Sequence, residues 1–246
     1  KTPADLEIEA FVHGAMCVSY SGRCLLSNYM TGRDSNRGAC AQPCRYQYYL
    51  MEEKRPGEYF PVFEDEKGTY IMNSRDMCMI EHIPELIEAG ISSFKIEGRM
   101  KSAYYAAIVT NAYRHAVDSA IKGEALDPIW VEETEKLSHR PYCTGFYYGY
   151  PGQHYSKASY LSEADVAAVV ESCDEKGRAV LTQRNKFYKG DELELIGPDI
   201  RSVKFRAEHM YNAEGEEIED TRHPMMEIHM SLPCPAPRLS IVRKCR

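Results

Sequence analysis

The sequence contains no stretch that approaches about 18 consecutive apolar residues, the length that a helix needs to cross a membrane. Its opening residues, KTPADL, have no apolar core of the kind found in signal peptides, and the chain does not begin with Met. We therefore expect a piece of a longer cytoplasmic protein with no membrane partner. Positive charge is also in deficit, because 30 Lys and Arg face 37 Asp and Glu, for a net charge of −7. That balance argues against nonspecific binding of nucleic acid and leaves room only for a local basic face.

Motifs of well-known hydrolases and zinc sites are missing as well. The sequence has neither the H-E-x-x-H motif of zinc peptidases nor the G-x-S-x-G motif of serine hydrolases. It also lacks the C-x-x-C pairs of zinc ribbons. A cysteine nucleophile with a histidine partner stays open, because His13 and Cys17 lie close in the sequence.

Cysteine, in contrast, is abundant. The chain has 9 cysteines, an odd number that cannot all pair within one chain, and we expect a reducing compartment. Five of them lie in the first third of the chain: Cys17, Cys24, Cys40, Cys44 and Cys78. Thiolates at such wide spacing could converge on zinc or on an iron–sulfur cluster, and the alternative is free thiols buried as small apolar groups. The scattered remainder, Cys143, Cys173, Cys234 and Cys245, is expected to be incidental.

The length fits one large domain or two small ones at about 150 residues per domain. In residues 1–123 a strand at 6–13, a helix from Ser74 or Asp76 to about 89, a strand at 93–97 and a helix at 102–122 predict parallel βα units. These are too few to close an eight-stranded barrel, so we expect the C-terminal half of a (β/α)8 TIM-like barrel. Residues 124–145 are expected to be a linker with a short helix. Short β-like runs between turns predict a small β-barrel domain over residues 146–246.

Several stretches resemble one family. They are 9–17 (EAFVHGAMC), 38–45 (GACAQPCR), 73–78 (NSRDMC) and 94–101 (FKIEGRMK), and 142–146 (YCTGF) opens a region similar to the family's C-terminal β domain. Together they resemble the collagenase-like peptidase family U32, in particular a branch whose members hydroxylate tRNA. Some family members are described as collagenases of unknown catalytic type, and others hydroxylate RNA or a ubiquinone precursor without oxygen.

The resemblance implies an enzyme that makes 5-hydroxyuridine at the wobble position of tRNA, with prephenate as the hydroxyl donor. It also implies a 4Fe-4S cluster on Cys17, Cys24, Cys40 and Cys78, with Cys44 as the alternative ligand. The partners would be tRNA and the missing N-terminal half, supplied by the same protein or by a partner chain. A collagenase-like peptidase and a non-catalytic RNA-binding fragment are the alternative functions.

Candidate catalytic residues stand at the ends of two expected strands. Glu9 and His13 have the same parity in the first strand, which predicts that they share one face, and His13 ends it. Glu97 and Arg99 end the next strand, where a carboxylate could move protons and an arginine could bind a carboxylate or phosphate. The alternative for these two is a structural Glu–Arg pair.

Basic residues gather around the cysteines and after the second strand. Arg37 and Arg45, together with Lys95 and Lys101, are the candidates for binding RNA or substrate. Tyrosines near them could stack on bases, although for each of these rings a place in the core is the simpler interpretation.

Overall fold

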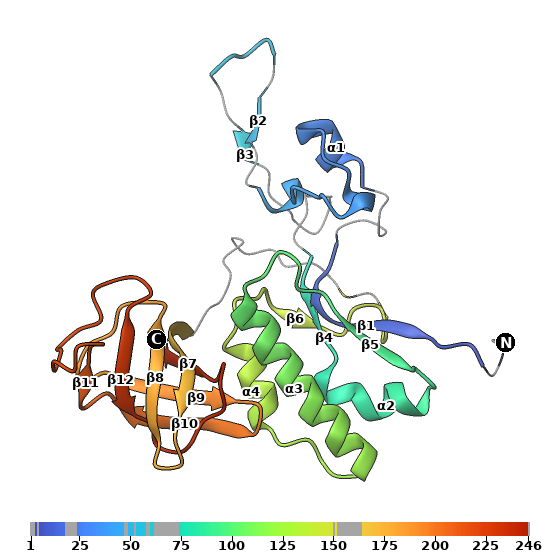
Figure 1. Cartoon of the computed structure of the whole chain (residues 1–246). Coiled ribbons are helices and arrows are strands. Elements are labelled where there is room, and N and C mark those ends of the chain that lie inside the picture. Colours follow the sequence, from blue (N-terminus) through green and yellow to red (C-terminus); the bar gives the residue numbers. More distant parts are fainter. Residues whose placement is uncertain are drawn as a thin grey trace. The chain divides into compact units, whose positions relative to one another are not determined.

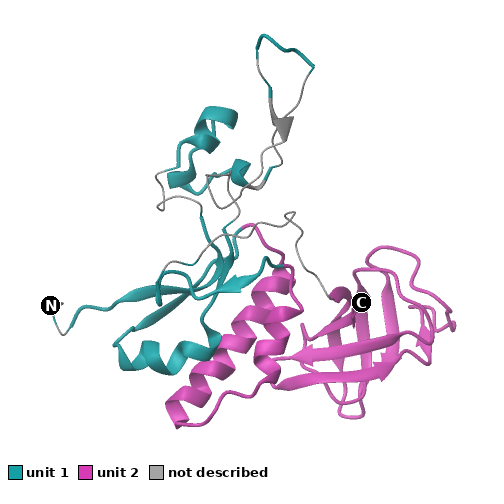
Figure 2. Ribbon diagram, turned by 180° about the vertical axis from the view of Figure 1, so that it is seen from behind, with its two compact units in different colours: residues 1–99, 139–160 teal, residues 100–138, 161–246 magenta. Residues whose placement is uncertain are grey.

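The computed structural model describes residues 3, 5–17, 24–46, 49–51, 53–57, 60–61, 74–149, 151 and 164–245. The chain divides into two compact units, shown in Figure 2. Unit 1 comprises residues 1–99 and 139–160, and unit 2 comprises residues 100–138 and 161–246. No helix of the described residues combines the length and the apolar character that a membrane span requires.

Unit 1 is built on a four-stranded mixed sheet in the order β5-β1-β4-β6 (Figure 1). The strands are β1 Glu9–Ala15, β4 Asp76–Cys78, β5 Ser93–Ile96 and β6 Tyr142–Cys143. As the sequence predicts, β1 and β5 are parallel, whereas β4 runs antiparallel to β1 and parallel to β6. The apolar side chains of Val12, Ile80 and Ile83 are buried in this unit.

The remaining elements of unit 1 are short. They are α1 Leu26–Thr31, the 3-10 turns η1 Ser35–Arg37, η2 Pro43–Arg45 and η3 Ile80–His82, the hairpin strands β2 Tyr49–Leu50 and β3 Phe60–Pro61, and α2 Ile83–Glu88. The expectation of a helix starting at Ser74 or Asp76 is wrong. Residues 76–78 form a strand, because the Asp76 carboxylate is buried against Arg140 and does not cap a helix. The helix begins only at Ile83.

Unit 2 contains the two predicted helices, α3 Ala103–Lys122 and α4 Ile129–Glu135. The side chain of Ser102 accepts a hydrogen bond from the Tyr105 amide at 3.2 Å and caps α3, and Gly123 ends it with a φ of 71°. The His115 ring stacks on the Trp130 ring with centroids 3.9 Å apart. Both helices belong with the C-terminal sheet, so the compact units divide the chain at other positions than the expected boundary at residue 123.

The sheet of unit 2 has seven antiparallel strands in the order β10-β9-β13-β7-β8-β12-β11. They are β7 Ala164–Cys173, β8 Arg178–Gln183, β9 Glu192–Gly197, β10 Ile200–Arg206, β11 Met210–Tyr211, β12 Glu227–Ser231 and β13 Ile241–Cys245. Its core includes Val170, Leu181, Phe187 and Leu195. Within the described strands, β10 and β11 are the two edges of this sheet. The structure therefore confirms a mixed α/β fold. Closure of the sheet into a small β-barrel stays a prediction, and so does the TIM-like half-barrel expected in unit 1.

Candidate functional site

The end of β1 lies close to β5, and a glycine makes that approach possible. Gly14 has a φ of +125°, and a Cβ at this position would lie 2.4 Å from the Glu97 carbonyl oxygen. The Glu97 amide donates a hydrogen bond to the His13 carbonyl at 2.8 Å. On the other side of β1, His13 is in register with Cys78 of β4. Two of the predicted site residues, His13 and Glu97, and one predicted ligand are therefore brought to one end of the sheet.

Glu9 and His13 do not share a face. The register of β1 against β5 shifts between Phe11 and His13, and this bulge ends the simple alternation of side chains. His13 is 1% exposed, whereas Glu9 is exposed and its carboxylate accepts a hydrogen bond from Lys95 Nζ at 2.7 Å. Hydrogen bonds from Lys95 and then from Ser93 lower the pKa of Glu9. The expectation of a shared face is wrong, and Glu9 and Lys95 form a surface ion pair.

The ring of Tyr142 lies next to the rings of His13 and His139. The Tyr142 hydroxyl is 3.5 Å from His13 Nε2, and the Tyr142 ring stacks on the ring of His139 with centroids 4.0 Å apart. His139 is buried, and its Nδ1 lies 2.7 Å from the Arg140 carbonyl oxygen. The sequence analysis missed both His139 and Tyr142 as neighbours of His13, because they lie about 130 residues away in the chain.

Unit 1 holds a buried ion pair between Arg140 and Asp76. Arg140 Nε donates to Asp76 Oδ1 at 2.9 Å, its Nη1 donates to Ser74 Oγ at 3.1 Å and its Nη2 donates to the Arg75 carbonyl at 3.3 Å. Ser74 in turn donates to the Met16 carbonyl at 2.7 Å. This Arg140 network therefore connects the residue before Cys17 with the stretch that leads into Cys78.

Apart from a helix start at Ser74 or Asp76, the sequence predicts no role for any member of the Arg140 network. Ser74 and Asp76 stand in one of the stretches that resemble the family, and Arg140 lies just before another. Their place in or next to these stretches is the feature of the sequence that could have identified Ser74, Asp76 and Arg140 as important. No local pattern predicts an ion pair between residues 64 positions apart.

Arg99 contacts a loop. Its Nη1 donates to the Gly38 carbonyl at 2.8 Å, and a Cβ on Gly38 would lie 1.7 Å from that nitrogen, so glycine leaves the space that the guanidinium fills. The Glu97 carboxylate accepts a hydrogen bond from the Arg99 amide at 3.0 Å. The interaction that joins Glu97 to Arg99 thus runs through the backbone, and the arginine side chain ties β5 to the loop that carries Cys40.

The cysteine-rich segment, residues 24–46, is held together by polar contacts. Ser27 is fully buried and its hydroxyl accepts a hydrogen bond from the Ala41 amide at 2.9 Å. Ser35 Oγ donates to the Cys24 carbonyl at 2.7 Å, and the Gln42 amide donates to Cys40 Sγ at 3.3 Å. The segment therefore has a defined fold of its own around α1.

The cysteines are the candidate metal ligands. None of the nine is in a disulfide, and soft thiolate donors suit an iron–sulfur cluster. Cys17 is exposed, and Cys24, Cys40, Cys44 and Cys78 are half-buried. Over the described ranges, however, no group of three or more His, Cys, Asp or Glu side chains is arranged to hold a metal ion. The donor chemistry of these thiols suits a cluster, and the ligand set stays a prediction.

The four residues expected to bind RNA or substrate have different surroundings. Arg37 is 81% exposed, with Nε 3.6 Å from an Asp34 oxygen. Lys95 is paired with Glu9, and its ammonium lies 5.2 Å from the centre of the Phe11 ring. In unit 2, the Lys101 ammonium donates to the Ser138 carbonyl at 2.7 Å and lies 4.9 Å from the Tyr105 ring centre. Arg45 ends η2, and its side chain falls outside the described part.

Unit 2 holds a second cluster of buried charges. Arg243 donates to Glu133 at 2.6 and 2.7 Å, to Glu194 at 3.0 and 2.7 Å, and to the Tyr104 hydroxyl at 3.0 Å. Burial would raise the pKa of Glu194, but the hydrogen bonds and charge of Arg243 outweigh it and lower that pKa to about 2. Burial would also lower the pKa of Arg243, and the hydrogen bonds with Glu133 are the main reason that it is raised. Lys136 Nζ lies 2.9 Å from Glu133 and 3.3 Å from Glu194, so two cations balance the two carboxylates and the cluster has the features of a structural element that fixes α4 to the sheet.

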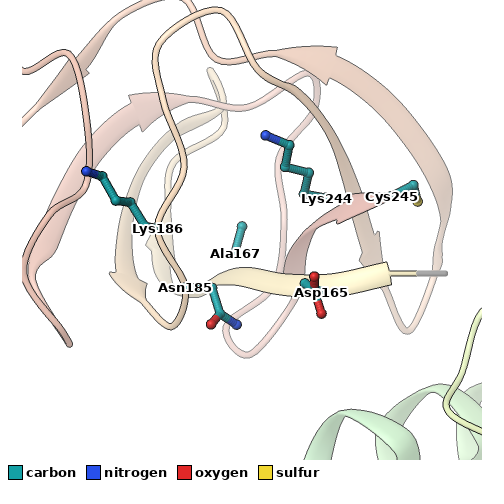
Figure 3. A pocket seen from close by; sticks show the side chains of 6 residues that line it. All are labelled: Asp165, Ala167, Asn185, Lys186, Lys244 and Cys245. Atoms are coloured by element: carbon teal, nitrogen blue, oxygen red, sulfur yellow. The ribbon is translucent and has the colours of Figure 1, made fainter. Parts of the chain in front are cut away.

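A pocket of about 370 Å³ opens in the sheet of unit 2 (Figure 3). Its lining consists of Asp165, Ala167, Asn185, Lys186, Lys244 and Cys245. Both lysines have carboxylate partners, since Lys186 Nζ lies 2.9 Å from Asp220 and Lys244 Nζ lies 2.7 Å from Asp191. The charges of this pocket are therefore already balanced by the protein.

Models of known protein families match both the N-terminal and the C-terminal part of the chain. Residues 1–157 match the model of peptidase family U32, and residues 162–243 match that of the U32 C-terminal domain. The tRNA hydroxylation protein P1 of Bacillus subtilis (strain 168) is 40% identical over 243 residues, which cover 94% of this chain and 56% of that protein. An uncharacterized protease of Methanocaldococcus jannaschii is 49% identical over 213 residues, which cover 83% of this chain and 51% of that protein.

A solved structure, the C-terminal domain of a Geobacillus thermoleovorans protein named as a U32 peptidase, is 32% identical with a TM-score of 0.31. It covers 32% of this chain and 99% of its own. The chain spans about half the length of the curated relatives it matches. Because the first family model alone covers well over half of the residues, the chain belongs to peptidase family U32.

Proposed function

We propose that this chain is part of an enzyme that hydroxylates tRNA. The observation that carries the proposal is the 40% identity, over 94% of the chain, to a protein named for tRNA hydroxylation. Similarity at this level extends through both units, so it includes the strand ends, the cysteine-rich segment and the C-terminal sheet. The substrate that follows is tRNA, which would place the protein in the cytoplasm.

In its finer form, the proposed reaction makes 5-hydroxyuridine at the wobble position with prephenate as hydroxyl donor and without oxygen. Nucleoside mass spectrometry of tRNA from a deletion strain tests the product. We expect wobble 5-hydroxyuridine to disappear from that strain and to return on complementation, and unchanged amounts would overturn the proposal. Growth without oxygen should leave the modification in place, whereas removal of prephenate synthesis should abolish it.

His13 and Glu97 are the acid–base groups that we propose for this reaction. Both lie at the same end of the sheet, where the Glu97 amide binds the His13 carbonyl, and the Glu97 side chain is half-buried. Glu9 and Arg99 are weaker members of the proposed set, because Glu9 is paired with Lys95 and Arg99 binds the Gly38 carbonyl. Glu97→Gln should therefore lower the yield of 5-hydroxyuridine more than Glu9→Gln does.

We also propose that Cys17, Cys24, Cys40 and Cys78 hold a 4Fe-4S cluster, with Cys44 as the alternative fourth ligand. Support comes from the soft donor chemistry of these five cysteines, none of which is in a disulfide. Anaerobic purification of the full-length protein should give a brown sample with about four iron atoms per chain. Iron loss in Cys78→Ala but not in Cys44→Ala would assign the fourth ligand to Cys78, and the reverse would assign it to Cys44. A colourless, iron-free protein would overturn the cluster.

A collagenase-like peptidase is the second candidate, because the relative from Methanocaldococcus jannaschii is named as a protease. A cysteine peptidase needs a histidine next to its nucleophile, and here His13 is 1% exposed with its Nε2 facing the Tyr142 hydroxyl. Cleavage of gelatin by the purified protein that survives Cys17→Ala and Cys40→Ala would favour a peptidase independent of these thiols.

The proposed barrel would be completed by the other half of a longer protein or by a partner chain.

A further inference from the structure

The cysteine-rich segment differs in charge from the rest of the chain. Residues 24–46 contain three arginines, Arg33, Arg37 and Arg45, against a single carboxylate, that of Asp34, and they include no Lys or Glu. The whole chain carries a net charge of −7. A locally basic segment in an acidic protein is the place where a polyanion would be bound with least repulsion.

This segment also presents an unpartnered aromatic ring. Tyr29 on α1 is 88% exposed, the highest value among the exposed large apolar side chains of the described residues. The Tyr29 side chain has no hydrogen bond and no ring contact within the described part of the chain. The helix beneath it is well fixed, because Thr31 Oγ1 donates to the Ser27 carbonyl at 2.7 Å and the Gly32 amide donates to the Asn28 carbonyl at 2.7 Å. A flat ring on a fixed support is suited to stacking on a base, whose face is also flat.

Two arginines follow this ring at intervals of four residues. The Arg33 side chain is exposed and has no hydrogen-bond or ion-pair partner among the described residues. Arg37 is 81% exposed and lies 3.6 Å from Asp34, whose carboxylate also accepts a hydrogen bond from Asn28 Nδ2 at 2.6 Å. Both guanidinium groups therefore extend into solvent and can reach a phosphate with little loss of existing contacts.

We propose that Tyr29, Arg33 and Arg37 form a binding surface for single-stranded RNA. Tyr29 stacks on an unpaired base, and the two arginines bind the phosphates on either side of it. This inference rests on the proposed tRNA function and names the surface that holds the unpaired part of that substrate. A double helix keeps its bases stacked inside and offers Tyr29 no base face, so the surface prefers single strands.

The test is the affinity of the full chain for a fluorescein-labelled, single-stranded RNA oligonucleotide, measured by fluorescence anisotropy, with a duplex of the same sequence alongside. Tyr29→Ala should raise Kd roughly 5- to 150-fold, since stacking contributes about 1–3 kcal/mol per base, and Tyr29→Phe should restore tight binding. Arg33→Gln and Arg37→Gln should each reduce the slope of log K against log salt concentration by about 0.7. The matched controls are Tyr188→Ala and Arg178→Gln, exposed residues of unit 2 that should leave Kd unchanged.

Single-strand affinity that is unchanged in Tyr29→Ala and Arg33→Gln would overturn the surface, even in a protein that hydroxylates tRNA. Weakened binding in these variants would support it, even if wild-type protein produced no 5-hydroxyuridine and the proposed function failed. Equal binding of single strand and duplex would contradict stacking by Tyr29. If Tyr29→Ala left RNA affinity intact but changed the sedimentation of the protein, a protein partner would cover this surface and the proposal would be overturned.

Discussion

Among the described residues each unit buries one arginine, and the two arginines have different partners. Arg243 in unit 2 binds side chains from separate elements: Glu133 on α4, Glu194 on β9 and Tyr104 on α3. Arg140 in unit 1 binds the single stretch 74–76, and through Ser74 it reaches the Met16 carbonyl. The same kind of cation therefore joins helices to a sheet in one unit and fixes backbone next to two cysteines in the other. Burial alone does not tell which role an arginine has.

The largest effect should come from Arg243→Met. It removes the buried guanidinium that Glu133 and Glu194 share and leaves the more exposed Lys136 against two buried carboxylates, so we expect a loss of about 3–5 kcal/mol in the free energy of unfolding. Urea unfolding followed by circular dichroism measures it. Arg178→Met is the control, because its exposed pair with Asp174 should contribute at most about 1 kcal/mol. Similar losses in both variants would show that the buried Arg243 cluster stabilises the protein no more than an exposed ion pair does.

Arg140→Met should also destabilise the protein, by about 3 kcal/mol, because it removes the cation that pairs with the buried Asp76 carboxylate. The double variant Arg140→Met with Asp76→Leu removes both charges and should recover most of the stability. It should not restore the placement of the cysteines, because the contacts of Arg140 with Ser74 and the Arg75 carbonyl are still lost. Alkylation of Cys17 and Cys78, followed by mass spectrometry, should be faster in the double variant than in wild type. Rates equal to wild type would assign Arg140 to stability alone.

Acid should weaken unit 2 through Glu194. Its pKa is lowered from 4.5 to about 2 in the folded protein, so the unfolded state binds the proton more readily. The contribution is fully present above about pH 4.5 and is lost as pH falls toward 2, and it amounts to at most about 3 kcal/mol. Urea midpoints between pH 6 and pH 2.5 measure this loss. Glu194→Gln should show a flatter acid dependence, and an equally steep one would contradict the assignment.

Ser74→Ala should have the smallest effect. It removes the hydrogen bond that Ser74 donates to the Met16 carbonyl and the one that it accepts from Arg140 Nη1, and it keeps the pair of Arg140 with Asp76, so we expect a loss of about 1–2 kcal/mol. Hydrogen–deuterium exchange should become faster at residues 15–17 and stay unchanged in β9 and β13. Ser35→Ala is the matched control, because it removes a serine bond to the Cys24 carbonyl and should affect exchange only around Cys24. Faster exchange throughout unit 1 would mean that Ser74 acts on the whole unit.

Elements that depend on local sequence were predicted well. Helix α3 begins after Ser102 and stops before Gly123 as predicted, because its cap, its apolar spacing and its left-handed terminus are all local features. The start of α2 and the face of His13 were predicted wrongly. Asp76 is held in a strand by Arg140, 64 residues away, and a bulge in β1 changes the side on which His13 lies. Such long-range pairs and register shifts leave no periodic pattern in the sequence.

By itself, the sequence determined the family resemblance, the main helices and strands, and the residues that could act as ligands or bind RNA. These follow from residue type and spacing, which one stretch of chain contains in full. Only the tertiary structure decided which charges neutralise each other: Glu9 with Lys95, Asp76 with Arg140, and Arg243 with Glu133 and Glu194. The physical reason is that a charge becomes buried or stays in solvent according to what packs against it. Tyr29 and Arg33 are exposed for the same reason, since neither side chain has a hydrogen-bond, ion-pair or ring partner among the described residues.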